Sequence, residues 1–552
     1  MNDKIAAAAV ELERTANDNG GAYEEPAVYK GSVARTMFDR PGSEDGTVTV
    51  LVPEKNVGNV CREAFVRIPS IDPRTGNQEA EYLGVVSSGP FAEPDALSPT
   101  ASTLIVAAAH SAVFTPGYHG IANVEIFGER VAGEMVPPVR RPCPNSPVFL
   151  LPNDDVRKVL GLNIEENERP FRLGLLDGVS GIAIEVPAAK KSVLFKHTAI
   201  LGTTGGGKST TVSGMIASLA AADNAVVVFD TEGEYTTINE PTQNPRMLAA
   251  LTKRGLQAKG VSKTALFHLA GRKTANPAHP NKHAFKIAFD DLSPHVLMEI
   301  LDLSEPQERR LIDAYDICKV VMRQLGIYPQ NDAEKNQSLD IDDLQSGWPR
   351  MTIHMIFDIV NLAMEYAGGT ANATQSPEFK DHEDDIRTLI KQRPPEKDKR
   401  SWMAIYGVLN KMRRAKIFAD RPADRLTAEA LVKPGLVSII DLSDMDAPYL
   451  RNMVIAQLLR TMQAHQDHLY KEFEERDDEP DAGLMTRVNI FIEEAHEFLS
   501  AERIRQMPNL FDQVARIARR GRKRYLGLVF ITQLPSHLPD EVLGSGPINR
   551  FH

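Results

Sequence analysis

Residues 202–209 limit what this chain can fold into more than any other stretch. They read Gly-Thr-Thr-Gly-Gly-Gly-Lys-Ser and fill the phosphate-binding pattern G-x-x-x-x-G-K-S/T completely. An apolar run at 198–201 precedes them and a helix-compatible run at 210–222 follows, so the sequence predicts a strand, a loop and a helix. An ordinary glycine-rich turn is the alternative. A chance match to the full pattern is rare, however, even without the requirement that a strand precede it and a helix follow it.

The residue types in this loop suit a nucleotide phosphate. Glycines let backbone N–H groups point at phosphate oxygens, and the N-terminus of the following helix adds a partial positive charge. Lys208 is expected to contact the β- and γ-phosphates of ATP, and the Ser209 hydroxyl is expected to ligate Mg²⁺. The predicted nucleotide-binding residues are Gly202, Thr203, Thr204, Gly205, Gly206, Gly207, Lys208, Ser209 and Thr210.

Composition restricts the class of protein further. A length of 552 residues predicts several domains, and a net charge of −11 argues that any nucleic-acid contact is a local basic lining. Cys61, Cys143 and Cys318 form no C-x-x-C pair, so neither a disulfide framework nor a zinc site is indicated. No run approaches the ~18 apolar residues that span a membrane, and no signal peptide is recognisable, so we expect a cytoplasmic protein without a membrane segment.

The pattern of apolar residues divides the chain into regions. A flexible tail is expected at 1–23, and short β-rich segments between turn residues indicate one β domain, a sandwich or small barrel, at 24–152. A β/α core is predicted at 153–289 and 430–552, and a helical insertion at 290–429. The expected β segments are 27–34, 47–52, 64–68, 81–86, 104–109, 124–131 and 148–151.

Helical spacing marks the insertion. Helices are predicted in it at 292–301, 306–325, 352–366, 379–391 and 401–411. Two further helices are predicted outside it, at 154–162 and 449–473. The basic cluster at 411–416 is consistent with nucleic-acid contact, although a solvated helix face is the more common explanation. The loop at 474–486 is acidic and is expected to be exposed.

Acidic residues follow several predicted core strands. The run 225–229 ends in Asp230-Thr231-Glu232-Gly233-Glu234-Tyr235, the run 436–440 ends in Asp441, and the run 488–492 ends in Glu493 and Glu494. Ligands of parallel sheets bind at the carboxyl ends of strands. Glu493 is predicted to hold the metal shell and Glu494 to deprotonate the attacking water, although two glutamates could equally begin a helix.

The basic run 516–524 precedes the predicted strand 526–532. Such a run is most often a solvated surface, but arginines at this place are also suited to reach the nucleotide of a neighbouring subunit. Arg522 is the predicted trans-acting finger, with Arg519, Arg520 and Arg524 as alternatives. Gln533, at the end of the strand, is predicted to sense the γ-phosphate through its amide.

The order of these motifs resembles the HerA branch of the HerA/FtsK superfamily of hexameric DNA-pumping ATPases. The resemblance covers nearly the whole chain from about residue 24, and its combination of motifs is more specific than any motif alone. The stretches that carry it are 199–209, the D-x-x-G-E-Y-like 230–235, Glu-Glu-Ala-His at 493–496, Gly-Arg-Lys at 521–523 and Thr-Gln-Leu-Pro-Ser at 532–536.

This resemblance implies a multidomain α/β fold with an N-terminal β-barrel and a RecA-like P-loop ATPase core that carries an inserted helical domain. It also implies a homohexamer with ATP and Mg²⁺ at subunit interfaces and double-stranded DNA in a central channel. An accessory protein is expected on the barrel, either a NurA-like nuclease in DNA end processing or an antiphage effector, nuclease or sirtuin-like.

Two departures from the family pattern concern Glu493 and the end of the chain. Glu493 stands where many relatives have Asp, and it is expected still to bind Mg²⁺ through water. Relatives continue beyond residues 549–552 with a further strand and tail, so either the chain is truncated or its last core strand is short.

Three functions remain open from the sequence. The first is a motor that translocates on or unwinds duplex DNA, and the second is a ring-shaped ATPase scaffold that assembles and switches a partner effector. The acidic net charge favours the scaffold somewhat. The third is an unrelated P-loop ATPase that moves protein substrates, as type IV secretion motors do.

Overall fold

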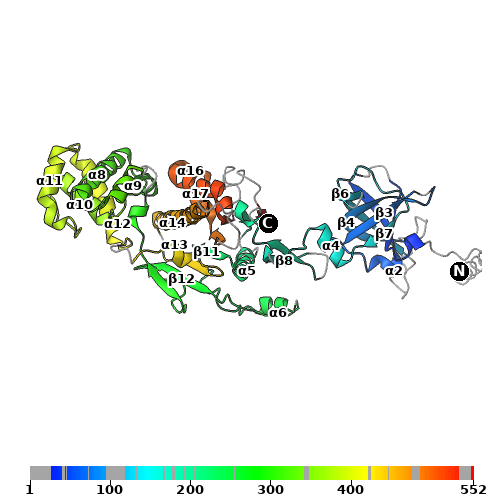
Figure 1. Ribbon diagram of the computed structural model, residues 1–552. Helices are drawn as coiled ribbons and strands as arrows, with labels where there is room; N and C mark the ends of the chain where they lie inside the picture. The colour runs from blue at the N-terminus through cyan, green and yellow to red at the C-terminus, as the bar shows by residue number, and fades with distance from the viewer. Residues whose placement is uncertain are drawn as a thin grey trace, which may run out of the picture. The chain divides into compact units, whose positions relative to one another are not determined.

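The computed structural model describes residues 27–39, 44, 46–72, 74–94, 118–131, 134–165, 168–176, 181–190, 193–203, 207–253, 255–340, 347–419, 424–445, 447–474, 485–533 and 549–551 (Figure 1). The predicted tail at 1–23, the predicted strand at 104–109, loop residues 204–206, Pro535, Ser536 and most of the loop at 474–486 lie outside these residues. Contacts divide the chain into two compact units, residues 1–163 with 174–184 and residues 164–173 with 185–552.

The first unit contains a closed β-barrel. Its strands pair in the order β2-β1-β7-β3-β4-β5, and β2 pairs again with β5, which closes the sheet, while β6 extends the edge of β5. Val48, Val50 and Val52 of β2 alternate inward, as a half-buried strand requires. The bounds are β1 (Ala34–Thr36), β2 (Thr47–Pro53), β3 (Phe65–Ile71), β4 (Gln78–Pro94), β5 (Tyr118–Val131), β6 (Glu134–Val136) and β7 (Pro147–Leu150).

The predicted strand at 27–34 is wrong for most of its length. Residues Ala27–Tyr29 form a 3₁₀ helix, η1, and the strand begins only at Ala34. Two short helices, α2 (Glu54–Val57) and α4 (Asn153–Val159), accompany the barrel strands. The barrel itself is the N-terminal fold that the family resemblance implies.

The second unit is built on a parallel sheet. Its order is β13-β12-β14-β11-β15-β16-β10-β17, and all of these pairs are parallel. One strand, β16, separates β10, which leads into the phosphate loop, from β15, which leads into Glu493; this is the order of a RecA-like core. The bounds are β10 (Thr198–Leu201), β11 (Ala225–Asp230), β12 (Thr264–Leu269), β13 (Lys282–Phe285), β14 (Val437–Asp441), β15 (Val488–Ile492), β16 (Leu526–Thr532) and β17 (Asn549–Phe551).

Helices cover both faces of this sheet. Val226 and Val228 of β11 pack with α5 (Lys208–Ala221) on one face. Val227 and Phe229 point to the other face, where α7 (Pro294–Ile300), α14 (Pro448–Glu474) and α17 (Pro508–Arg520) pack. The continuous burial of β11, β14, β15 and β16 follows from this double cover.

The chain between β13 and β14 is mostly helical. The predicted helical region is present, and α8, α10, α11 and α12 pack together (Figure 1). Their bounds are α8 (Glu305–Gln324), α9 (Asp332–Asp340), α10 (Ile353–Tyr366), α11 (Glu383–Gln392), α12 (Lys399–Arg414) and α13 (Ala428–Leu431). None of the helices in the described part of the chain combines the length and apolar composition needed to cross a membrane.

Several elements were not predicted. They are β12 and β13 of the core sheet, the small sheet of β8 (Pro170–Leu175) and β9 (Ala183–Pro187), and α6 (Pro245–Lys253). Short helices also follow the acidic pair and precede β16: α15 (Ala495–Leu499), α16 (Ala501–Gln506) and η7 (Gly521–Arg524).

Candidate active site

A cavity of about 790 Å³ lies at the carboxyl ends of the core strands. It brings together most of the site residues predicted from the sequence, because β10, β11, β15 and β16 are parallel neighbours whose carboxyl ends share one edge of the sheet. Among the described residues its lining comprises Thr203, Gly207, Lys208, Ser209, Thr210, Glu232, Glu234, Glu493, Glu494, His496, Glu497 and Gln533.

The phosphate loop enters helix α5 through a left-handed residue. Gly207, the residue before the helix, has φ +85°, a conformation in which a side chain is strained. Lys208 is the first residue of α5, so the helix N-terminus and the lysine lie at the same wall of the cavity. Gly202 is not among the described lining residues, and its N–H donates to the carbonyl oxygen of Thr532 over 3.4 Å.

Glu494 accepts hydrogen bonds from two other predicted site residues. Its Oε1 atom accepts hydrogen bonds from Lys208 Nζ and from Gln533 Nε2, each over 3.0 Å. Glu494 has φ +46°, which is uncommon for a residue with a side chain, and this left-handed turn separates β15 from α15. Lys208, the predicted phosphate-binding residue, and Gln533, the predicted sensor, therefore both donate hydrogen bonds to Glu494, the predicted base.

His496 also contacts Glu494, and sequence reasoning assigned it no role. Its Nδ1 atom lies 3.1 Å from Glu494 Oε2 and 3.3 Å from Thr532 Oγ1. The signal was present in the Glu-Glu-Ala-His stretch, where a histidine follows the predicted base by two residues. The distance between them could not be predicted without the left-handed turn at Glu494.

Glu493 and Asp230 form a buried carboxyl pair. Glu493 is 3% exposed and Asp230 is fully buried. Glu493 Oε2 accepts from the backbone N–H and the hydroxyl of Thr231 (2.9 and 3.2 Å) and from Glu232 N–H (3.2 Å). Burial, together with the mutual repulsion of the two carboxylates, raises the pKa of Glu493 well above its usual range, and burial likewise raises the pKa of Asp230.

Asp230 also shapes the turn that follows β11. Its Oδ1 accepts the N–H groups of Gly233 (2.8 Å) and Glu234 (3.0 Å), and its Oδ2 accepts that of Tyr235 (2.9 Å). Gly233 has φ +76°, and a Cβ atom there would lie 2.7 Å from the Ala275 Cβ. This turn therefore needs both the aspartate and the glycine, and it places Glu232 and Glu234 at the cavity.

The side-chain oxygens of the cavity are suited to Mg²⁺ that is bound together with a nucleotide, rather than to a metal ion held by protein ligands alone. Within the described ranges, no group of three or more His, Cys, Asp and Glu residues is placed to hold a metal ion. Mg²⁺ is usually bound by one or two protein oxygens together with substrate phosphates and water. Ser209 and Glu493 both line the cavity and offer such oxygens.

The charge of the lining is unusual for a site that is to hold a polyanion. Five glutamates line the cavity, at positions 232, 234, 493, 494 and 497, while Lys208 is the one Lys or Arg among its described lining residues. Glu497 is compensated by Arg451 at 3.0 Å, and Glu493 has a raised pKa. A nucleotide triphosphate therefore needs more positive charge than this lining supplies.

Arg522 is not at this cavity. It lies in η7, before the amino end of β16, whereas Gln533 follows the carboxyl end of the same strand. A seven-residue strand separates the two ends by roughly 20 Å. Arg522 is exposed, and Arg524 instead packs over the Tyr470 ring at 4.9 Å and is ion-paired with Asp467. Arg522 therefore does not reach the nucleotide site of its own chain.

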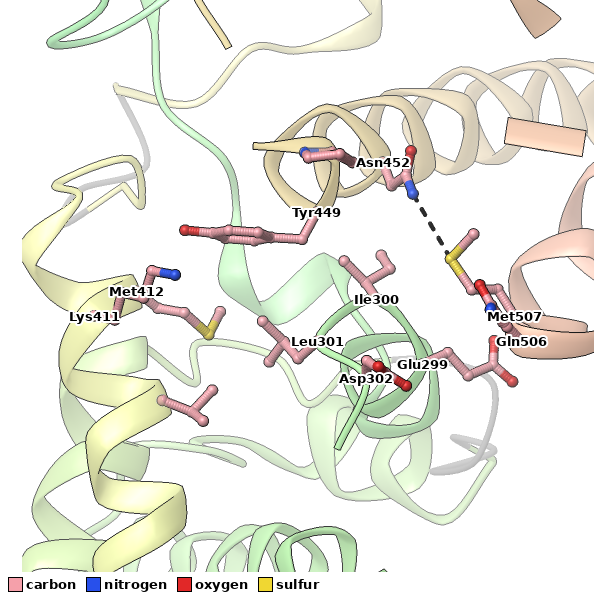
Figure 2. A pocket seen from close by; sticks show the side chains of 12 residues that line it. Glu299, Ile300, Leu301, Asp302, Lys411, Met412, Tyr449, Asn452, Gln506 and Met507 are labelled. Carbon is pink, nitrogen blue, oxygen red and sulfur yellow. Dashed lines mark hydrogen bonds between the residues drawn. The ribbon is translucent and has the colours of Figure 1, made fainter. Parts of the chain in front are cut away.

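The basic cluster of α12 is partly engaged within the fold. Arg413 Nη1 donates to Gln375 Oε1 over 2.9 Å, and its guanidinium lies 4.7 Å from the Phe357 ring centroid. Lys411 Nζ lies 5.2 Å from the Tyr449 ring centroid, at the wall of a second cavity of about 400 Å³ (Figure 2). In the same cavity Glu299 lies beside Gln506 and Met507, and it accepts the backbone N–H groups of Asn509 and Leu510 at the start of α17.

The parallel sheet, the phosphate loop and the carboxylates at the strand ends define a P-loop ATPase domain. The family model described as Helicase HerA, central domain, matches residues 171–462, which is more than half of the chain. The chain belongs to this HerA family.

The curated relatives are distant. The DNA double-strand break repair helicase HerA of Sulfurisphaera tokodaii is 21% identical over 421 residues, which cover 75% of this chain and 64% of the relative. That of Pyrococcus furiosus is 23% identical over 452 residues, 77% of this chain and 66% of the relative. The chain thus spans less than two thirds of the length of the first of these relatives and about two thirds of the second.

Solved structures also match over most of the chain. VirB4 of Thermoanaerobacter pseudethanolicus aligns with a TM-score of 0.36 and 14% identity, over 68% of this chain and 81% of that one. The bacterial conjugative coupling protein TrwBdeltaN70 aligns with a TM-score of 0.34 and 12% identity, over 71% of each chain.

Proposed function

We propose that this chain is the subunit of a hexameric, ATP-hydrolysing motor that translocates on or unwinds double-stranded DNA. The observation that carries the proposal is the convergence of Lys208, Gln533 and His496 on one carboxylate, Glu494, inside a cavity at the carboxyl edge of a P-loop sheet. A phosphate-binding cation, a polar sensor and a general base within hydrogen-bond distance of one another are the parts that phosphoryl transfer to water requires.

In this proposal the reaction uses the residues as follows. Lys208 leaves Glu494 and binds the β- and γ-phosphates. Ser209 and Glu493 would supply oxygens to Mg²⁺, which when bound would neutralise phosphate charge. Glu494 accepts the proton of the attacking water, and Gln533 donates its amide to the γ-phosphate or to that water. Loop residues Gly202 to Gly207 and Thr210 complete the phosphate cradle.

The electrostatics of the cavity support a contribution from a second copy. The described lining carries five glutamates against one lysine, so the developing charge on the transferring phosphoryl group needs an additional cation. Arg522 is exposed and lies too far from its own cavity to supply it. An arginine from a neighbouring subunit, Arg522 or one of Arg519, Arg520 and Arg524, meets this need in a closed ring.

DNA and effector partners follow from the family rather than from the cavity. The relatives' names describe DNA double-strand break repair helicases. We propose that the barrel docks an accessory protein in the cytoplasm, a NurA-like nuclease in DNA end processing or an antiphage nuclease or sirtuin-like effector.

A second candidate function is a ring-shaped ATPase scaffold that switches such an effector with little translocation. It is favoured by the net charge of −11 and by the engagement of Lys411, Arg413 and Arg524 in contacts within the fold. These cations are less available to a DNA backbone than the sequence alone indicates.

ATP turnover with and without duplex DNA separates the two functions. A motor is expected to hydrolyse ATP several-fold faster when long duplex DNA is added, and the stimulation is expected to fall with salt because phosphate contacts are screened. Lys208→Ala serves as the inactive control. An ATP hydrolysis rate that does not change when DNA is added but changes when a purified barrel partner is added would exclude the motor and support the scaffold.

A further inference from the structure

We infer that His496 is the positioning residue that keeps the base Glu494 in place when nucleotide occupies the cavity. The inference rests on the proposed function, because it concerns ATP hydrolysis at the same site. It starts from the way in which the two oxygens of Glu494 are held.

The two oxygens of Glu494 have different partners. Oε1 is shared between Lys208 and Gln533 at 3.0 Å each, whereas Oε2 lies 3.1 Å from His496 Nδ1. An ionised carboxylate can only accept hydrogen bonds, so Nδ1 of His496 carries the proton in this contact. The imidazole therefore donates to the oxygen that Lys208 does not touch.

Nucleotide binding removes one of these partners. The phosphates compete for Lys208, and a lysine that moves to them leaves the neutral amide of Gln533 as the one remaining partner of Oε1 among the described residues. His496 is the partner on Oε2, and Thr532 Oγ1 at the carboxyl end of β16 lies 3.3 Å from the same Nδ1 atom, where the hydroxyl oxygen can accept a share of that N–H. After Lys208 has left, the orientation of the carboxylate depends on His496 and Gln533.

The backbone makes this support more important. Glu494 occupies a left-handed conformation at the junction of β15 and α15, and such conformations persist only when their surroundings hold them. His496 lies two residues further, in the short helix α15 that begins directly after Glu494. Its hydrogen bond closes a small loop over the turn and fixes the side chain relative to Gln533 and the phosphate loop.

Steady-state ATPase kinetics of His496→Ala and His496→Asn test this role. The side-chain amide nitrogen of asparagine occupies the place of Nδ1, so His496→Asn retains a donor while His496→Ala does not. We expect His496→Ala to lower kcat about 10- to 100-fold with KM for ATP within about threefold of wild type, because misplacement by about 1 Å costs up to ~100-fold. We expect His496→Asn to recover kcat to within about threefold of wild type.

His468→Ala is the matched control, because His468 is an exposed histidine of α14 that also lies beside a glutamate, Glu472. It is expected to retain wild-type kcat and KM. A His496→Ala variant with kcat within twofold of wild type overturns the inference. So does an asparagine variant that is as slow as the alanine variant, because a donated hydrogen bond then does not explain the loss.

A thermal double-mutant cycle tests the contact without hydrolysis. Melting temperatures of nucleotide-free His496→Ala, Glu494→Ala and the double variant are expected to be non-additive, since either substitution alone already breaks the contact. Additive shifts overturn the inference. Wild-type protein that hydrolyses ATP no faster than Lys208→Ala defeats the proposed function instead, and this cycle then decides whether His496 holds Glu494.

Discussion

Glu494→Gln is expected to bind ATP more tightly than the wild-type chain does. Lys208 Nζ lies 3.0 Å from Glu494 Oε1, and the two side chains are only 9% and 11% exposed. Lys208 has to leave this carboxylate before it can bind phosphate. ATP binding to the wild-type protein therefore breaks a hydrogen bond between two charged groups, which the amide of the variant weakens.

The size of the gain follows from the strength of that bond. A hydrogen bond involving charged groups contributes about 1.5 to 3 kcal/mol, and removal of one of the two charges forfeits about half of it, about 0.8 to 1.5 kcal/mol. This difference corresponds to an about 4- to 12-fold lower Kd. Loss of a negative charge from a cavity that binds a polyanion acts in the same direction, so the estimate is a lower bound.

Calorimetric titration with a non-hydrolysable ATP analogue and Mg²⁺ measures this Kd. Glu497→Gln is the matched control, because Glu497 lines the same cavity but is paired with Arg451 rather than with Lys208. It removes the same charge without releasing the lysine, so its gain is expected to be clearly smaller. A Glu494→Gln variant with a Kd equal to or above that of wild type would refute the inference that ATP binding has to break the Lys208–Glu494 contact. Turnover of ATP by this variant is expected to be lost in any case.

Two further predictions concern Lys208 and Glu493. Lys208→Ala is expected to abolish hydrolysis and weaken ATP binding, because the phosphates lose their cation; retention of more than about half of wild-type turnover in a steady-state assay contradicts the site. The raised pKa of Glu493 beside Asp230 means that the folded state binds a proton which the unfolded state releases, so stability is greatest below the unfolded pKa and falls as pH rises through the folded pKa. In thermal denaturation without nucleotide or metal, the melting temperature is expected to fall from pH 6 to pH 8.5 and to fall less in Glu493→Gln; parallel curves for the two proteins contradict this assignment.

Most of the fold could be predicted from the sequence, because its main strands and helices carry strong local patterns. The strand before the phosphate loop, the continuous apolar run of β11 and the long helix α14 all lie where their patterns place them. The barrel and the P-loop core are confirmed. The edge strand β13 could not be found, because it reads Lys-His-Ala-Phe and is mostly exposed, so it has neither an apolar run nor alternation.

The location of the site could be predicted better than its contacts. The carboxyl ends of parallel strands lie at one edge of the sheet, which predicts that Lys208, Glu494 and Gln533 lie near one another. In the structure Lys208 Nζ and Gln533 Nε2 each lie 3.0 Å from Glu494 Oε1. The contact between His496 and Glu494 depends on the left-handed backbone conformation of Glu494, which no sequence pattern predicts. The distance of Arg522 from its own cavity likewise depends on the length and direction of β16. The roles of these residues remain predictions.

The central claim, that each ATP site is completed by an arginine of a neighbouring subunit, is tested most directly by mixing two inactive variants. Arg522→Ala is expected to bind ATP nearly as wild type does but to hydrolyse it ~10³- to 10⁵-fold more slowly, or less so if Arg519, Arg520 or Arg524 substitutes. Lys208→Ala retains its arginine but lacks the phosphate lysine. Mixed rings of the two variants are expected to regain ATPase activity, because some interfaces pair an intact Lys208 with an intact Arg522. Mixed rings with verified co-assembly and no activity above either parent would contradict the shared site.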